Sequence, residues 1–298
     1  MRVHRTGRLL SSILLCGLTA FVHGAADNCI EFEINGGIMQ FPISIQDQSV
    51  TARINGSNTN FISQGLVDEL NLKVQSDPNR ITVRSDGEEG MYTFVTDIDA
   101  GLFGTNLRLE HLAVDTSNPG KDISMSLMLF DGSVVQINYP GTLLCFYNRE
   151  SVNLIDSSNI DFGSATNFGN PVVRVRLNDT TNVWLQVNFG VANSVTIDRA
   201  TASALDLIDS DREEGLEEIW VDSSIDVMNF GPYELGNVSA RYPKARIRDN
   251  VNTGSELTTG TYIQRSREAS GSLDMEVLRH FVITLDRENE RMNVYLPR

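Results

Sequence analysis

The chain alternates apolar and polar residues over many short stretches, and polar turn residues separate these stretches. Residues 41–45 and 171–177 each alternate in this way and then pass through a short polar loop into a second alternating stretch. A period of two residues is the signature of a strand with one buried face. Turn signals such as Asp131-Gly132 punctuate the pattern. The pattern predicts a mostly β chain, in a barrel or a sandwich, with a few short helices.

The order of these stretches occurs twice along the chain. Residues 41–72 and residues 171–207 both contain a strand, a polar loop, a second strand that leads to a glycine, and an amphipathic segment that ends in Leu. Residues 133–138 and residues 281–286 also match each other near the end of each half. We therefore predict two like domains. They span 27–150 and 171–298, and a linker rich in Asn, Ser and Gly joins them at 151–170.

The first 26 residues have the composition of a targeting segment. Three arginines begin the segment, residues 9–22 are apolar, and small residues follow at 24–26. These features predict a secretory signal peptide that is removed from the mature protein. No other stretch has the length and apolar character of a membrane span. The expected location is therefore periplasmic or extracellular, with no membrane partner after cleavage.

Charge and cysteine content narrow the classes of partner. The formal net charge is −15, and removal of residues 1–26 would take away three arginines and no acidic residue. Nucleic acid is excluded as an expected partner because binding it needs a basic face. Export would leave Cys29 and Cys145 as the two mature cysteines. In an oxidising compartment they can form a disulfide, and the alternative is two thiols that do not meet.

Two short segments carry a resemblance to a known family. Residues 52–58 read ARINGSN, and residues 186–192 read QVNFGVA. Together with the repeated layout and residues 271–286, they make the chain similar to the retropepsin-like aspartic protease family of the pepsin/retropepsin clan, in a tandem form. The resemblance implies two acid-protease-like closed barrels related by pseudo-twofold symmetry. It also implies Asp-Thr/Ser-Gly motifs at these two segments, which this chain lacks.

The loss of both aspartates bears on the expected chemistry. In the family, two adjacent carboxylates share one proton, and they activate water and protonate the peptide carbonyl. When Gly56 is matched with Gly190, Ile54 and Asn188 occupy the aspartate positions. Neither residue can take a proton from water. We therefore expect no catalytic residue, and we expect a degenerate protease that binds a peptide or protein segment in a groove between the domains.

The resemblance also predicts where that groove lies. Hairpins near residues 85–94 and 209–221 would form its roof. Its floor would be formed by the residues around the two degenerate motifs, which are Asn55, Gly56, Ser57, Phe189 and Gly190. No cofactor or metal is expected, because His111 and His280 have no second ligand near them in sequence.

Two alternatives remain open. The first is a working aspartic endopeptidase, with carboxylates supplied from elsewhere or by a dimer. The candidates for these carboxylates within the chain are Asp47, Asp86, Asp198 and Asp286. Each also has an ordinary structural explanation, in a turn, at a helix cap or at a strand end. The second is a structural role without a ligand. The sequence does not indicate the oligomeric state.

Overall fold

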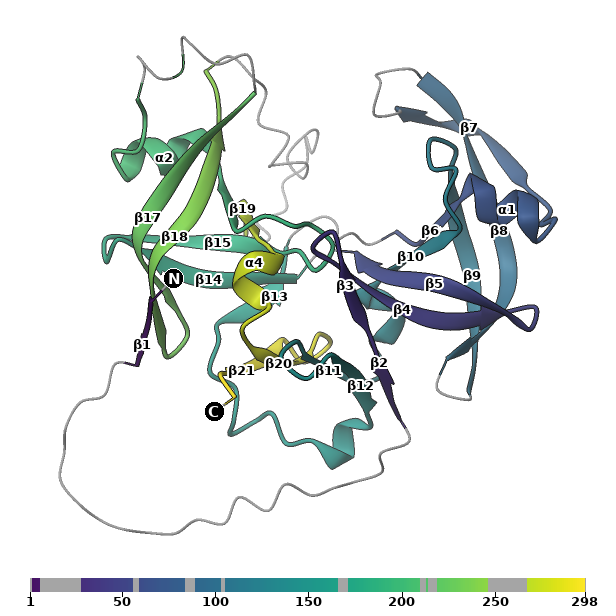
Figure 1. The fold of residues 1–298 in the computed structure, drawn as a ribbon, viewed down its shortest axis with the longest axis horizontal. Helices are drawn as coiled ribbons and strands as arrows, with labels where there is room; N and C mark the ends of the chain where they lie inside the picture. The colour runs from purple at the N-terminus through teal and green to yellow at the C-terminus, as the bar shows by residue number, and fades with distance from the viewer. Residues whose placement is uncertain are drawn as a thin grey trace, which may run out of the picture.

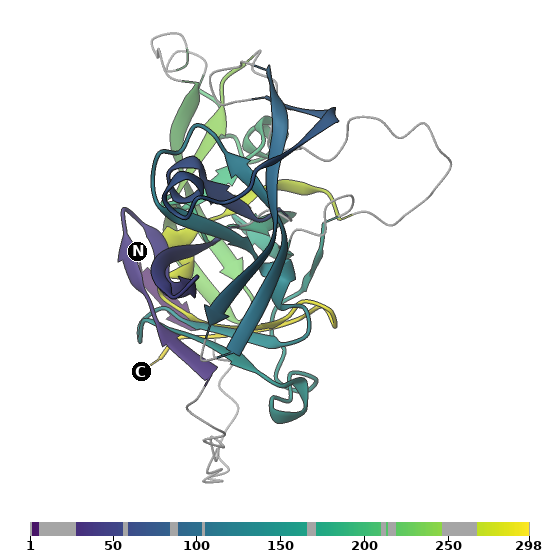
Figure 2. The ribbon, with the colours of Figure 1, turned by 90° about the vertical axis from the view of Figure 1, so that its right-hand side faces the viewer.

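Strands dominate the fold, and the helices are short. The structure is a computed structural model. It describes residues 2–5, 28–55, 59–83, 89–102, 105–165, 171–209, 213, 219–245 and 267–297. Figure 1 shows two β-rich lobes joined by a smaller sheet, and in the view of Figure 2 the first lobe lies in front of the second. The predicted all-β class is confirmed.

The first lobe is a barrel closed by strand pairing. Its strands are β4 (Ile38–Ile45), β5 (Gln48–Asn55), β6 (Phe61–Ser63), β8 (Glu89–Leu102), β9 (Thr105–Asp115) and β10 (Asp122–Ser126). The pairing runs from β4 through β5, β10, β6, β9 and β8 and returns to β4. The β5–β10 and β6–β9 pairs are parallel, and the other pairs of the ring are antiparallel. The helix α1 (Gln64–Glu69) follows β6, and β3 (Glu33–Asn35) and β7 (Gln75–Val83) extend the sheet at its two ends.

The second lobe repeats this pairing strand by strand. Its strands are β14 (Pro171–Leu177), β15 (Thr181–Val187), β16 (Val195–Ile197), β17 (Trp220–Phe230), β18 (Tyr233–Pro243) and β19 (Ala269–Leu273). The ring runs from β14 through β15, β19, β16, β18 and β17 back to β14, with parallel pairs at β15–β19 and β16–β18. The helix α2 (Arg199–Ala204) follows β16, as α1 follows β6. The repeat read from the sequence is thus present in the fold.

The alternating pattern explains the interior of both barrels. In β14, Val173, Val175 and Leu177 are at most 2% exposed, whereas Arg174 and Arg176 between them are exposed. Successive side chains of a strand point to opposite faces, so each alternating strand contributes one apolar side to its barrel. The two interiors join into one continuous apolar core.

A five-stranded sheet joins the two halves. It runs in the order β2 (Cys29–Glu31), β12 (Leu143–Tyr147), β11 (Val134–Asn138), β20 (Val282–Asp286) and β21 (Arg291–Tyr295). The β11–β20 pair at its centre is antiparallel and comes from the two segments that match in sequence. Two equivalent strands that pair antiparallel are related by a local twofold axis. The predicted pseudo-twofold arrangement of two closed barrels therefore describes this fold.

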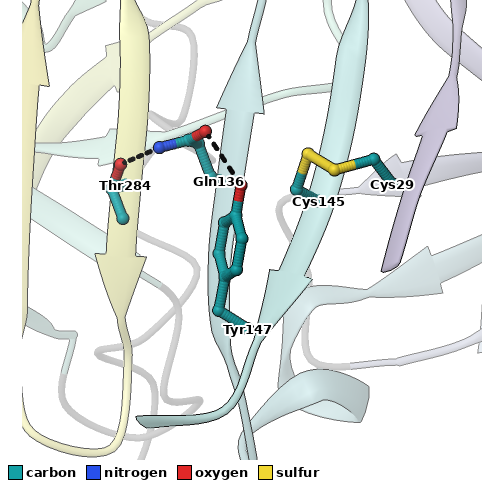
Figure 3. Close-up of a disulfide and its surroundings, with 5 residues drawn as sticks. All are labelled: Cys29, Gln136, Cys145, Tyr147 and Thr284. Carbon is teal, nitrogen blue, oxygen red and sulfur yellow. Dashed lines mark hydrogen bonds between the residues drawn. A yellow bond between two sulfur atoms is a disulfide. The ribbon is translucent and has the colours of Figure 1, made fainter. Parts of the chain in front are cut away.

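Covalent and polar contacts stabilise this sheet. Cys29 and Cys145 form a disulfide between β2 and β12, so the first of the two alternatives for these cysteines is confirmed. Figure 3 shows the disulfide beside a chain of hydrogen bonds between the halves. Gln136 on β11 donates to the hydroxyl of Thr284 on β20 at 2.9 Å, and Tyr147 donates to Gln136 at 3.4 Å.

The structure describes part of the predicted linker and part of the hairpins that were predicted to form the roof of the groove. Residues 151–165 include β13 (Phe162–Ser164), which pairs with β14, and Ile160, which forms a bridge with Met292. This part of the linker therefore packs on the second half. In the first roof region β7 and β8 form a hairpin whose turn, residues 84–88, lies outside the described residues. Most of the second roof region, 210–212 and 214–218, lies outside them as well.

The N-terminal segment is described only at its start. The strand β1 (Arg2–Arg5) lies antiparallel to β18, with Arg5 opposite Tyr233. Residues 6–27, which include the apolar stretch and the expected cleavage region, lie outside the described residues. The signal peptide therefore stays a prediction. Within the described parts of the chain, every helix is too short or too polar to cross a bilayer.

Candidate functional site

The strand registers show which residues of the two motifs are equivalent. In the first half Asn55 lies opposite Ser126, the residue that precedes the short 3-10 helix η2 (Leu127–Phe130). In the second half the backbone N–H of Asn188 bonds to Leu273, directly before Asp274, the residue that precedes α4 (Met275–Leu278). Asn55 and Asn188 therefore stand at the same place in the two barrels.

This register corrects the expectation for Ile54. Gly56 follows Asn55 by one residue, whereas Gly190 follows Asn188 by two, so matching the two glycines places the first motif one residue out of register. A shift of one residue moves a side chain to the opposite face of its strand. Ile54 is fully buried in the barrel core. The degenerate pair is therefore Asn55 and Asn188.

The ends of the two motif strands meet between the barrels. A Cβ placed on Gly190 would lie 3.1 Å from the carbonyl oxygen of Ile54 and 3.7 Å from the Cα of Asn55. A glycine suits this position because a side chain there would press on the backbone of the other half. The structure thus brings Asn55, Asn188 and Gly190 together. Gly56 and Ser57 lie outside the described residues.

Phe189 differs from its predicted place on the groove floor. Its side chain is fully buried and belongs to the apolar core. Phe189 lies in a turn after the end of β15, where its side chain packs into the core while the preceding Asn188 is half-buried. Phe189 therefore contributes to packing beneath the site.

Both carboxamides form hydrogen bonds within their own half. The side-chain N–H groups of Asn55 donate to the carbonyl oxygen of Thr59 at 3.1 Å and to the hydroxyl of Ser124 at 2.9 Å. The side-chain oxygen of Asn188 accepts from the backbone N–H of Gly190 at 3.1 Å. A carboxamide can hold a loop in this way, but it cannot accept a proton from water near neutral pH.

The four aspartates considered as substitutes have other roles or lie outside the described chain. Asp47 has a φ of 62° in the turn between β4 and β5. Asp198 caps α2 by accepting from the N–H of Thr201 at 2.7 Å, as expected from the sequence. Asp286 is paired with Arg149 at 2.9 Å in the five-stranded sheet. Asp86 falls within residues 84–88, which are not described.

A fifth aspartate, Asp274, lies beside the site and was not among the four candidates drawn from the sequence. Its side chain is 1% exposed, and its Oδ1 has no hydrogen-bond partner among the described residues. Burial raises its pKa to about 7, although a hydrogen bond from Ser272 and the charge of Arg241 act in the opposite direction. The signal in the sequence was a charged residue between Leu273 and Met275, both buried.

Metal chemistry has no support in the described part of the chain. No group of three His, Cys, Asp or Glu side chains there is arranged to hold a metal ion. His111 contacts Tyr92 and Phe94, and burial lowers its pKa. Burial lowers the pKa of His280 as well.

Comparisons with known proteins return a similarity of fold. No protein-family model and no curated protein sequence matches the chain. Among solved structures, the chain is similar to the crystal structure of Basic 7S globulin from soybean, with 9% sequence identity and a TM-score of 0.49. The alignment covers 90% of this chain and 94% of the globulin chain. Identity this low gives no information about activity.

Proposed function

We propose that this protein is an exported, catalytically inactive relative of the retropepsin-like aspartic proteases that binds an extended peptide or protein segment between its two barrels. The observation that carries the proposal is the pair Asn55 and Asn188. These residues occupy equivalent strand ends that meet between the halves, and each uses its carboxamide to hold its own loop. The chain thus retains the architecture of the site but has amides where the reaction needs carboxylates.

Binding of an extended segment is the function that remains when the acids are lost. Extended peptides bind proteins through backbone hydrogen bonds to strands and through pockets for alternate side chains. Neither interaction requires a group that titrates. Export follows from the composition of residues 1–26, and it is consistent with the disulfide between Cys29 and Cys145.

The first experiment asks whether the protein cleaves peptides. The full chain is incubated with an unfolded protein substrate at acid and neutral pH, with and without a pepstatin-type inhibitor. We expect no inhibitor-sensitive cleavage and measurable retention of peptides by the immobilised protein. Inhibitor-sensitive cleavage by the natural sequence would overturn the proposal. Absence of cleavage together with absence of any peptide retention would favour a purely structural role.

A second experiment restores the acids. The double variant Asn55→Asp with Asn188→Asp places carboxylates at the two equivalent positions, and Asn182→Asp, on the exposed side of β15, is the matched control. If the site retains protease geometry, the double variant gains acid-dependent cleavage and the control gains none. A double variant that is folded, binds peptides and cleaves nothing would show that the site has lost more than its two acids.

The alternative function, an active endopeptidase, rests on one specific observation. Asp274 is a buried carboxyl group beside Asn188, and its pKa of about 7 would allow it to exchange a proton near neutral pH. One carboxyl group is half of the pair that the family mechanism uses. If cleavage is found, Asp274→Asn should abolish it, whereas Asp226→Asn, an exposed residue on β17, should leave it unchanged.

A further inference from the structure

Each motif strand presents one side to its barrel interior and the other side to the site. Asn55 and Arg53 lie on the same side of β5, and the buried Ile54 between them points inward. The hydrogen bond from Asn55 to Ser124 places this side of β10 next to it. In the same way, Asn188 and Gln186 lie on one side of their segment, with the buried Val187 between them. We call these two surfaces the Asn55 face and the Asn188 face.

The strand registers extend both faces across their barrels, position by position. From β5 outward, the Asn55 face contains Arg53, Ser124, Phe61, Ala113 and Phe94. From β15 outward, the equivalent positions of the Asn188 face are Gln186, Ser272, Thr196, Arg241 and Asp222. Because both barrels have the same pairing, the two lists can be compared directly. The outer part is apolar on the first face and polar on the second.

Aromatic rings form the outer part of the Asn55 face. The rings of Phe94 and His111 are stacked with centroids 4.4 Å apart, and Tyr92 lies 5.9 Å from Phe94. The hydroxyl of Tyr92 lies 2.9 Å from the Nε2 of His111, and the guanidinium of Arg80 lies 4.1 Å above the ring of Tyr92. These contacts fix the rings in place. A preformed aromatic surface of this kind suits an apolar or aromatic side chain.

A small polar cavity lies on the Asn188 face. Its volume is about 340 Å³, and Arg241, Asp222 and Glu276 are among the residues that line it. The Nε of Arg241 donates to Thr196 at 3.1 Å, and its guanidinium lies 4.7 Å above the ring of Trp220. Trp220 precedes Asp222 by two residues on β17, as Tyr92 precedes Phe94 by two residues on β8, so the two aromatic residues occupy equivalent positions. No carboxylate within the described ranges forms a salt bridge with this guanidinium.

We propose that the segment bound by this protein carries an apolar or aromatic side chain against the Asn55 face and a carboxamide side chain, Gln or Asn, in the cavity of the Asn188 face. The proposal rests on the proposed function and specifies its ligand. A carboxamide both accepts and donates hydrogen bonds, so it can accept from Arg241 and donate to Asp222 or Glu276. A ligand carboxylate would meet the two acids, and an ammonium group would meet the guanidinium. An apolar group would leave the N–H groups of Arg241 without a partner when it displaced water.

The experiment measures side-chain preference as well as affinity. The full chain is titrated with a positional library of blocked, unstructured peptides, and the affinity ratios Phe to Ser and Gln to Glu are determined at each position. We expect one position that prefers aromatic residues and another that prefers carboxamides. Arg241→Met should lower the Gln preference about tenfold, which corresponds to the loss of one hydrogen bond to a charged group. It should leave the aromatic preference unchanged.

The converse variant tests the other face. Phe94→Ala should lower the aromatic preference about tenfold and leave the Gln preference unchanged. The matched controls are Arg176→Met, an exposed arginine on β14, and Met91→Ala, an exposed residue on the opposite side of β8. If Arg241→Met does not fold, Arg241→Lys retains the charge and should weaken the preference through loss of the planar donors.

The outcomes separate this inference from the proposed function. Peptide binding without positional preference, or with a preference for Glu or Lys in place of Gln, would overturn the inference and leave peptide binding intact. Preferences that both variants leave unchanged would overturn it as well. Absence of binding by every peptide would overturn the proposed function, and the inference with it.

Discussion

The five-stranded sheet and the strand ends at the site each bury an aspartate, and the two aspartates differ in their partners. Asp286 is 3% exposed and accepts hydrogen bonds from Arg149 at 2.9 Å and from the side chain of Asn289 at 2.7 Å. Asp274 is 1% exposed, and its Oδ1 has no hydrogen-bond partner in the described structure. The aspartate of the sheet that joins the barrels thus has partners for its carboxylate, whereas the aspartate at the site has an oxygen without one.

The consequence appears in the pKa values. Burial alone would raise the pKa of Asp286, but the hydrogen bonds from Asn289 and Arg149 outweigh burial and hold its pKa below the ordinary value. For Asp274 burial prevails, and the pKa rises to about 7. The two carboxyl groups therefore have opposite charge states near pH 6, because Asp274 is buried more deeply and lacks the hydrogen-bond partners of Asp286. The unsatisfied carboxyl group of Asp274 is therefore expected to cost stability.

The largest expected effect on the free energy of unfolding concerns the disulfide of the five-stranded sheet. The disulfide closes a loop with a sequence separation of 116 residues, so its loss should cost about 4–5 kcal/mol in the chain-entropy model. We expect the double variant Cys29→Ser with Cys145→Ser to lower the urea midpoint by a corresponding amount. Hydrogen exchange should show lost protection in β2 and β12 before β15 and β19. A change below about 1 kcal/mol would mean that the covalent link adds little to this sheet.

The next largest effect on stability concerns Asp274 at the site, and it depends on pH. The pKa of Asp274 is about 7 in the folded state and 3.8 in the reference state. Between these values the folded chain retains a proton that the unfolded chain has lost, so stability falls as pH rises from about 4 to 7. Asp274→Asn removes this penalty and should stabilise the protein by up to about 4 kcal/mol at pH 8, with little effect at pH 4.

Asp286→Asn should behave in the opposite way, because its folded pKa is lowered. The stability that this carboxylate contributes is present above its unfolded pKa, and it is lost as pH falls through its folded pKa. Unfolding curves at pH 4, 6 and 8 for the two variants and the natural sequence test both signs. A pH profile of Asp274→Asn parallel to that of the natural sequence would show that Asp274 is not protonated in the folded state.

A third effect tests whether the ion pair with Arg149 is what allows Asp286 to be buried as a carboxylate. Arg149→Met leaves this buried carboxylate without its cation, and breaking such a pair is costly. The side chain of Arg149 is 30% exposed, so solvent screening reduces the cost below that of a fully buried pair. The matched control is Arg176→Met, which breaks an exposed pair with Asp179 and should cost less than about 1 kcal/mol. Equal losses in the two variants would contradict the role given to Arg149.

The sequence was sufficient for the fold but not for the register of the site. Alternation and turn residues located the strands, because these features are local. The internal repeat implied two like domains, and the resemblance implied that each is a closed barrel. Gly56 follows Asn55 by one residue, whereas Gly190 follows Asn188 by two, so matching the two glycines shifted the comparison by one residue and exchanged Ile54 for Asn55. The burial of Asp274 depends on packing between segments far apart in the chain, so its position between the apolar residues Leu273 and Met275 was a signal but could not establish the burial.

The smallest expected effect concerns the two carboxamides themselves. Asn188→Ala removes one acceptor from the N–H of Gly190 and should cost about 1 kcal/mol, and Asn55→Ala removes the two hydrogen bonds to Ser124 and Thr59 and should cost about 1–2 kcal/mol. Asn182→Ala, on the exposed side of β15, should be close to neutral. The loss of stability in each asparagine variant relative to the control matters more than the size of either loss. If both asparagines behave like the control, their hydrogen bonds add little to stability, and the proposed ligand could contact the two amides directly. If both losses appear, the amides have a structural role, and the proposed ligand would have to be recognised by the faces beside them.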